Sequence, residues 1–200
     1  MYRIFLGSLI VLLLCSSVSA ENNFSIGIRG GYYLAPNWAD TYDVIYDNGG
    51  ELAFGLELGY RIFDSLEIGI AYDLVSGDGE RVWPDESGGF FGTGESVTFD
   101  LNLATIFGRY YFLPEFDVSP YLGAGLGYAM FEETGEDSEN GIGFLVLGGM
   151  KWDWTQAFQL MIEGEYSAYP DVIGSGDLSE YFNEDDVGGL TVRLGMRYSF

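Results

Sequence analysis

The 200-residue chain carries 31 acidic and 8 basic residues, and its formal net charge is −23 at pH 7. Nucleic-acid phosphates would repel so acidic a chain, which excludes DNA and RNA as expected partners. Hydrophobic residues make up 48% of the chain and aromatic residues 17%, which is too apolar for a disordered acidic tail. Histidine is absent, and the one cysteine lies in the first twenty residues, so we expect no catalytic residue, no cofactor and no enzyme activity.

Residues 1–20 have the pattern of a secretory signal peptide. Arg3 precedes an apolar run that ends at Leu14, and small residues follow. This order predicts export and cleavage after residue 20, which leaves residues 21–200 as one domain. The apolar run is short for a membrane anchor, and Leu14 is large for the residue before a lipidated cysteine. An uncleaved anchor and lipidation at Cys15 are the alternatives.

Eight segments alternate large apolar residues with small or polar ones at period two, which predicts strands with one apolar and one polar face. They are Phe24–Tyr32, Leu52–Ile62, Leu66–Leu74, Val97–Phe112, Tyr121–Phe131, Ile142–Trp152, Phe158–Tyr166 and Val187–Phe200. Strands of this length with an apolar outer face suit a transmembrane barrel, although a soluble sandwich strand alternates in the same way.

The connections between these segments alternate in length. Four are long and polar, at about 34–50, 75–96, 132–141 and 167–186, and three are short, at 63–65, 113–120 and 153–157. Aromatic residues gather at both ends of the segments, as they do where rings meet lipid headgroups. A soluble sandwich has no reason to separate loop lengths in this way. The sequence therefore predicts an all-β, eight-stranded antiparallel up-and-down transmembrane β-barrel, with turns and termini in the periplasm. Ten strands are an alternative.

The fourth segment breaks the pattern. Its first half, Val97–Leu103, would place its apolar residues outward and Asp100 inward, and continuing the count would place Arg109 in lipid. A basic residue on the lipid face near the midplane costs about 2–4 kcal/mol. We therefore predict a β-bulge between Leu103 and Gly108 that turns Arg109 inward.

Most charges of the predicted strands share the inward face. The expected lumenal set is Arg29, Glu57, Arg61, Glu67, Asp73, Asp100, Arg109, Lys151, Glu163, Glu165, Arg193 and Arg197. An eight-stranded barrel is just wide enough for its own side chains to fill it. The sequence therefore favours a lumen plugged by ion pairs. The alternative is a narrow channel for ions or small solutes.

The remaining acids fall mostly in the long connections, where they keep the loops solvated. Carboxylates are also the ligands that calcium prefers, so divalent cations at Glu132–Glu139 and Glu184–Asp186 form a second hypothesis. Neither cluster has the spacing of a defined calcium loop, and we assign no metal ligand. A cationic partner at the cell surface is a third hypothesis.

Three stretches resemble the OmpA/OmpX-type outer-membrane β-barrel domain family: GRYYF at 108–112, PYLGAGLGYA at 120–129 and RLGMRYSF at 193–200. The resemblance spans residues 24–200. It implies the outer membrane of a Gram-negative-type bacterium, contact with outer-membrane lipid, and insertion by the outer-membrane assembly machinery. That machinery would recognise the aromatic end of the last strand, here Tyr198 and Phe200. Because the chain ends with this strand, we expect no peptidoglycan-binding domain. The resemblance specifies architecture and hardly any activity; the acidic loops and the plugged lumen predict a structural or surface-interaction role through acidic extracellular loops.

Overall fold

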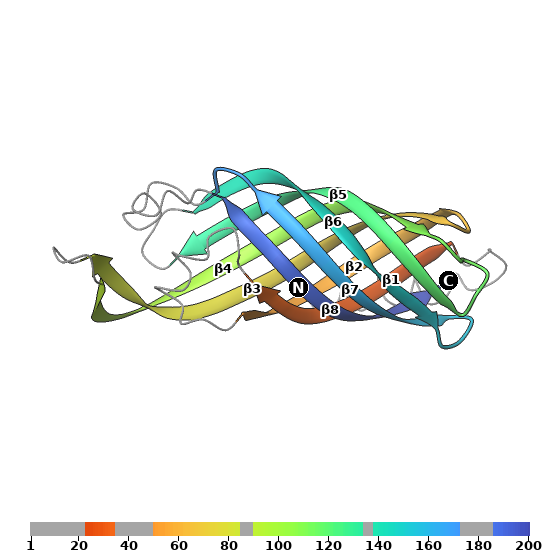
Figure 1. The fold of residues 1–200 in the computed structure, drawn as a ribbon, viewed down its shortest axis with the longest axis horizontal. Coiled ribbons are helices and arrows are strands. Elements are labelled where there is room, and N and C mark those ends of the chain that lie inside the picture. The colour runs from red at the N-terminus through yellow and green to blue at the C-terminus, as the bar shows by residue number, and fades with distance from the viewer. Residues whose placement is uncertain (1–22, 35–49, 85–89, 134–137, 173–185) are drawn as a thin grey trace, which may run out of the picture.

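A computed structural model describes residues 23–34, 50–84, 90–133, 138–172 and 186–200, which form one closed antiparallel barrel (Figure 1). Its strands are β1 (Phe24–Leu34), β2 (Glu51–Phe63), β3 (Leu66–Pro84), β4 (Phe90–Tyr111), β5 (Val118–Glu133), β6 (Glu139–Asp153), β7 (Phe158–Tyr169) and β8 (Val187–Ser199). Each strand pairs with its neighbours in sequence, and β1 pairs with β8 to close the ring. The predicted eight-stranded up-and-down barrel is confirmed. The expected signal peptide lies outside the described residues.

The two ends of the barrel differ. We call the end with the short β2–β3, β4–β5 and β6–β7 connections the turn end, and the opposite end the loop end. At the turn end the last residue completes the ring: Phe200 N–H donates to Phe24 O at 2.8 Å, and Phe24 N–H donates to Phe200 O at 3.2 Å. A row of ring contacts crosses this seam through Tyr60, Phe24, Phe200, Tyr198 and Phe158, with centroids 4.7 to 6.2 Å apart.

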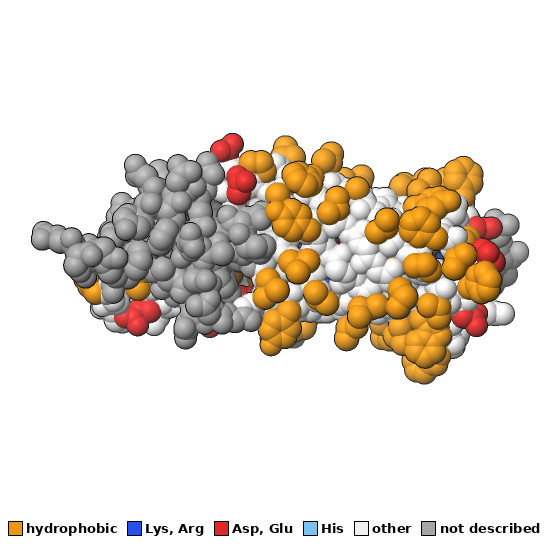
Figure 2. Space-filling model, in the orientation of Figure 1, with side chains coloured by type: hydrophobic (Ala, Val, Ile, Leu, Met, Phe, Trp, Pro, Cys, Tyr) orange, Lys and Arg blue, Asp and Glu red, His pale blue; other side chains and the backbone are white. Residues whose placement is uncertain are grey.

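Large apolar side chains lie on the outside of the barrel between its two ends, and Figure 2 shows those of one face in orange, with white patches of small side chains and backbone between them. Leu56, Leu126 and Leu194 are each exposed by 60% or more. Water would disfavour so large an exposed apolar surface, whereas lipid chains would cover it. The outward and inward faces of β1, β2, β5, β6, β7 and β8 are those that the alternation predicts.

Strands β3 and β4 continue beyond the rest of the barrel at the loop end as a long hairpin (Figure 1). The prediction of a connection over residues 75–96 is wrong, because β3 runs to Pro84 and β4 begins at Phe90. The polar, glycine-rich sequence of this stretch suggests a loop. Its alternation nevertheless persists, with Ser76 and Asp78 exposed and Gly77 buried between them.

The predicted bulge between Leu103 and Gly108 is also wrong. The pairing of β4 with β3 is regular from Tyr110 back to Ser96, and its pairing with β5 shows no shift. Arg109 does face inward, but so do Phe99, Leu101 and Leu103, all buried, while Asp100 is exposed on the outside. The physical reason is a change of surroundings. Towards the loop end the wall leaves the apolar band, so its polar residues face outward and its apolar residues fill the interior.

Two apolar clusters and a set of charges fill the barrel. At the loop end lies a buried cluster that we call the apolar plug. Its residues are Tyr33, Ala53, Val75, Val97, Phe99, Leu101, Leu103, Ala129, Phe131, Tyr169, Val172 and Val187. A second cluster lies further towards the turn end: Ala71, Phe107, Tyr111, Tyr121, Leu145, Leu147 and Met161. The charged side chains described next share the lumen with this second cluster.

Candidate functional site in the barrel lumen

Nine charged side chains from six strands meet inside the barrel, and we call them the lumenal charge network. Its members are Arg29, Glu57, Glu67, Asp73, Arg109, Glu163, Glu165, Arg193 and Arg197. All are buried, with 6% or less of each residue exposed. Each belongs to the lumenal set expected from the sequence. Period-two alternation places them inside, because their strand neighbours are the apolar residues of the outer band.

Arg109 is the centre of the network. Its Nη2 lies 2.7 Å from Glu163 Oε2 and 2.9 Å from Glu57 Oε2, and its Nη1 lies 3.3 Å from Glu67 Oε1. One guanidinium thus joins carboxylates of three strands, β2, β3 and β7. The ring of Phe107 packs against the guanidinium with its centroid 4.3 Å away, a cation–π contact. Tyr121 donates to Glu163 Oε2 at 3.0 Å.

Arg29 and Arg193 bind the carboxylates on the β1, β3, β7 and β8 side. Arg29 binds both carboxylate oxygens of Asp73, with Nε donating to Oδ1 at 2.8 Å. This fork geometry is the strong, oriented form of an arginine–carboxylate pair. Arg193 Nη1 lies 2.7 Å from Glu165 Oε2, and its Nη2 lies 3.6 Å from Asp73 Oδ2.

Arg197 is the member of the network that lies nearest the turn end. Its Nε lies 2.8 Å from Glu57 Oε1, and its Nη2 lies 2.8 Å from Glu67 Oε2. It also donates to Ser25 Oγ at 2.5 Å and to the Tyr111 hydroxyl at 3.2 Å. Alternation alone would have marked Ser25 as inward-facing. It could not identify Ser25, Tyr111 or Tyr121 as partners of the charges.

Inward-facing glycines make room for these side chains. A Cβ at Gly55 would collide with Asp73 Oδ1, and one at Gly59 would collide with Arg197 Nη2. These two inward-facing glycines therefore leave space for longer charged side chains. Filling either position would push a buried charged group away from its present partners.

Three residues of the predicted set stand apart. Lys151 is buried and binds Asp153 at 2.7 Å near the turn end. Arg61 is half-buried on the inward face of β2, paired in register with Glu67. Asp100 does not belong to the lumen at all: it is exposed on the outside of β4 and accepts a hydrogen bond from Ser76 Oγ.

Every carboxylate of the network lies within 4.0 Å of at least one guanidinium. Five carboxylates face four guanidiniums, so the cluster is nearly neutral as a whole. Such an arrangement can join opposite walls and fill the lumen. Within the described ranges, no helix is long and apolar enough to cross a membrane, and no group of three or more metal-ligand side chains is suited to hold a metal ion.

The closed eight-stranded fold with a filled lumen is that of a small transmembrane β-barrel. Solved structures of such barrels resemble the chain. Neisserial surface protein A has a TM-score of 0.61 and 19% identity, and the match covers 92% of this chain and 100% of that one. OprG of Pseudomonas aeruginosa has a TM-score of 0.53 and 13% identity, covering 89% and 96%. The N-terminal β-barrel domain of Pseudomonas aeruginosa OprF has a TM-score of 0.50 and 16% identity, and the match covers 88% of this chain and 97% of that one.

These structural neighbours are small eight-stranded outer-membrane barrels, which agrees with the OmpA/OmpX-type resemblance of the sequence. No family model matches the chain, and no curated protein matches it. At these identities the likeness concerns the fold.

Proposed function

We propose that this protein is an integral outer-membrane barrel that holds acidic loops at the cell surface on a plugged scaffold. The observation that carries the proposal is the double closure of the lumen. The charge network fills its middle, and the apolar plug fills its loop end with residues that are each 7% exposed or less. A water-filled path would require both the charge network and the apolar plug to open. The network excludes water because ion pairs fill the space, and the plug excludes water because apolar side chains pack there.

The outside of the loop end supports the surface role. Asp78, Asp100 and Glu132 are exposed there on β3, β4 and β5. Six of the seven basic residues beyond residue 20 face the lumen, so only Arg81 belongs to the hairpin and connections of this end. The proposed extracellular surface is therefore acidic, and it suits a cationic partner. This role needs no catalytic residue and no cofactor.

Planar-bilayer recording of the folded protein tests the plugged lumen. We expect no steady current from the wild-type protein. Opening one layer, by Phe99→Ala with Leu103→Ala, should leave the bilayer sealed because the charge network remains. Regular conductance steps from the wild-type protein, changed in size by Arg197→Met, would instead establish the lumen as a channel.

A second experiment tests the acidic surface. Proteoliposomes of the wild-type protein should bind polylysine, and binding should fall as salt rises through the range in which surface charges are screened. A triple variant, Asp78→Asn, Asp100→Asn and Glu132→Gln, should bind several-fold less. Equal binding by the wild-type protein, the triple variant and protein-free liposomes would count against the surface role.

A further inference from the structure

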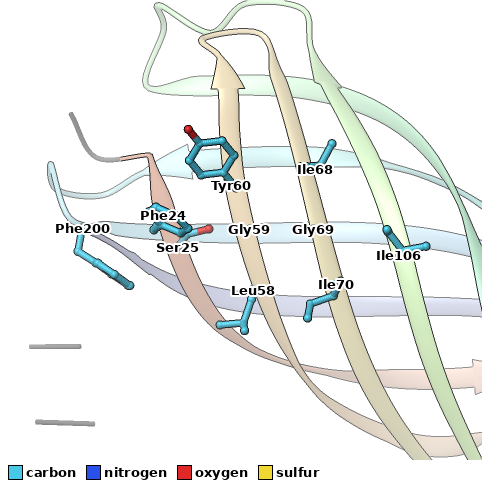
Figure 3. A pocket seen from close by; sticks show the side chains of 10 residues that line it. All are labelled: Phe24, Ser25, Leu58, Gly59, Tyr60, Ile68, Gly69, Ile70, Ile106 and Phe200. Carbon is cyan, nitrogen blue, oxygen red and sulfur yellow. The ribbon is translucent and has the colours of Figure 1, made fainter. Parts of the chain in front are cut away.

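A groove crosses the outer face of strands β1 to β4 near the turn end. Figure 3 shows its lining: Phe24, Ser25, Leu58, Gly59, Tyr60, Ile68, Gly69, Ile70, Ile106 and Phe200. Its volume is about 670 Å³. The charge network lies on the inner side of the same wall, so this groove is separate from the lumenal site.

Two rows of outward side chains form the walls of the groove. Register places Tyr60 beside Phe24 on one side and beside Ile68 on the other, which makes the first row. It places Ile70 beside Leu58 and Ile106, which makes the second. The rows are two residues apart along each strand, and the residues between them face the lumen.

The floor is bare backbone. Gly59 and Gly69 lie between the two rows and have no side chains, and an added Cβ would point inward, towards Arg197 and Phe107 respectively. At β4 the first row continues in register from Ile68 to Gly108, which also has no side chain. A Cβ there would meet only Glu67 O, at 3.8 Å, so space is open at this position. The walls of the groove are thus apolar carbon, and Gly108, which lies next to the lining residue Ile68 in register, leaves open space at the β4 edge of the groove.

We propose that this groove binds one acyl chain of a phospholipid from the membrane leaflet at the turn end. The inference rests on the proposed insertion in the outer membrane. With that insertion, the leaflet at the turn end is the periplasmic leaflet. Phe24, Tyr60 and Phe200 belong to the aromatic row at the turn end, where rings lie at the level of the headgroups. From that level the groove leads to Ile70 and Ile106, which are 53% and 59% exposed.

An extended hydrocarbon chain fits this shape and chemistry. The walls offer branched and aromatic carbon on both sides, and a chain lying between them gains dispersion contacts that a flat wall would not give. A second copy of the barrel would be convex where the groove is concave, so it would bridge the two rows rather than fill the space between them. The bound chain would order one lipid beside the seam of the barrel.

Native mass spectrometry of the protein purified from membranes in mild detergent tests the proposal. After delipidation, titration with a palmitoyl-oleoyl phosphatidylethanolamine should give one tightly retained phospholipid per barrel. Gly108→Leu fills the open end of the first row and should lower retention at least tenfold. Gly164→Leu is the matched control: Gly164 also faces outward, has open space before it, and lies on β7 away from the groove.

The heat-dependent gel shift of each variant shows whether it folds, and insertion into vesicles tests the membrane proposal by itself. Should Gly108→Leu fold poorly, Ile106→Ala provides the second test, because removing part of a wall should also weaken retention. Equal retention by the wild-type protein, Gly108→Leu and Gly164→Leu would overturn the groove, even with normal insertion. A dimer peak that only Gly108→Leu abolishes would also overturn it, by assigning the groove to a second copy.

Discussion

Arg109 on β4 binds Glu163 on β7 across the lumen, with 2.7 Å between Nη2 and Oε2. These strands are three positions apart in the ring of eight, so the pair connects walls that share no backbone hydrogen bonds. Both side chains are almost fully buried. Removing either partner would leave the other as an uncompensated charge in a packed interior.

The first prediction concerns this pair. Arg109→Met should lower the free energy of unfolding by about 3–5 kcal/mol, because three carboxylates lose a guanidinium. Combining it with Glu163→Gln should cost about 0.5–3 kcal/mol less than the sum of the single changes. Urea unfolding in lipid vesicles measures both values. Strict additivity would show that the two residues do not act together, and Arg61→Met serves as a half-buried control.

The second prediction tests the direction of the β4 wall. Leu101→Ala should cost about 2–5 kcal/mol because it opens a cavity in the apolar plug. Asp100→Ala, one residue away, should change stability by no more than about 1 kcal/mol because that side chain is exposed. The same unfolding assay compares them. The reverse order of the two effects would restore the face assignment that simple alternation suggested.

The third prediction compares two glycines. A Cβ at Gly31 would collide with the backbone of Val192 on β8, so Gly31→Ala should destabilise the barrel by about 1–3 kcal/mol. Gly164→Ala should be neutral or stabilising by up to about 1 kcal/mol, since its position is open and alanine restricts the unfolded chain. Equal losses of stability for the two variants would mean that the close approach of β1 and β8 does not determine the cost of a side chain at Gly31.

The fourth prediction concerns orientation. With Cys15 in the expected signal peptide, the mature protein contains no thiol, so single cysteines can be introduced as labels. Thr93→Cys, exposed on the hairpin at the loop end, should react with a membrane-impermeant maleimide on intact cells. Glu115→Cys, exposed at the turn end, should react only after the outer membrane is permeabilised. The opposite pattern would invert the proposed topology.

Alternation and charge were sufficient to predict most of the fold. On β8, Arg193 and Arg197 alternate with Leu194 and Met196, and the cost of a basic residue in lipid decides which face is inside. The same argument puts Arg29 on the inward face, and alternation with Leu56 and Leu58 puts Glu57 there; both side chains are buried in the structure. These assignments succeed because the outside of those strands meets a single apolar environment along most of their length.

The fourth strand shows where that reasoning ends. Period two gives the two faces of β4, but it does not give the surroundings of each face. Phe99 and Leu101 face inward because this part of the wall lies beyond the apolar band, and nothing in a run of ten residues marks where that band ends. The sequence also could not predict which charged residues of the network pair with one another, because the pairs depend on register and on side-chain conformations across the lumen.

The reversal of polarity along β3, β4 and β5 also marks the loop-end edge of the apolar wall on this side of the barrel. Ser76, Asp100 and Glu132 lie side by side in register as a polar row, directly above the apolar band. Changing this row to leucine would lengthen the hydrocarbon-facing wall by two residues per strand, or about 5 Å along the membrane normal. A variant of that kind should fold best in vesicles of longer-chain lipids, because hydrophobic mismatch carries a cost for every ångström. On this side of the barrel we therefore expect the row of three polar side chains to limit the bilayer thickness that the apolar wall can match.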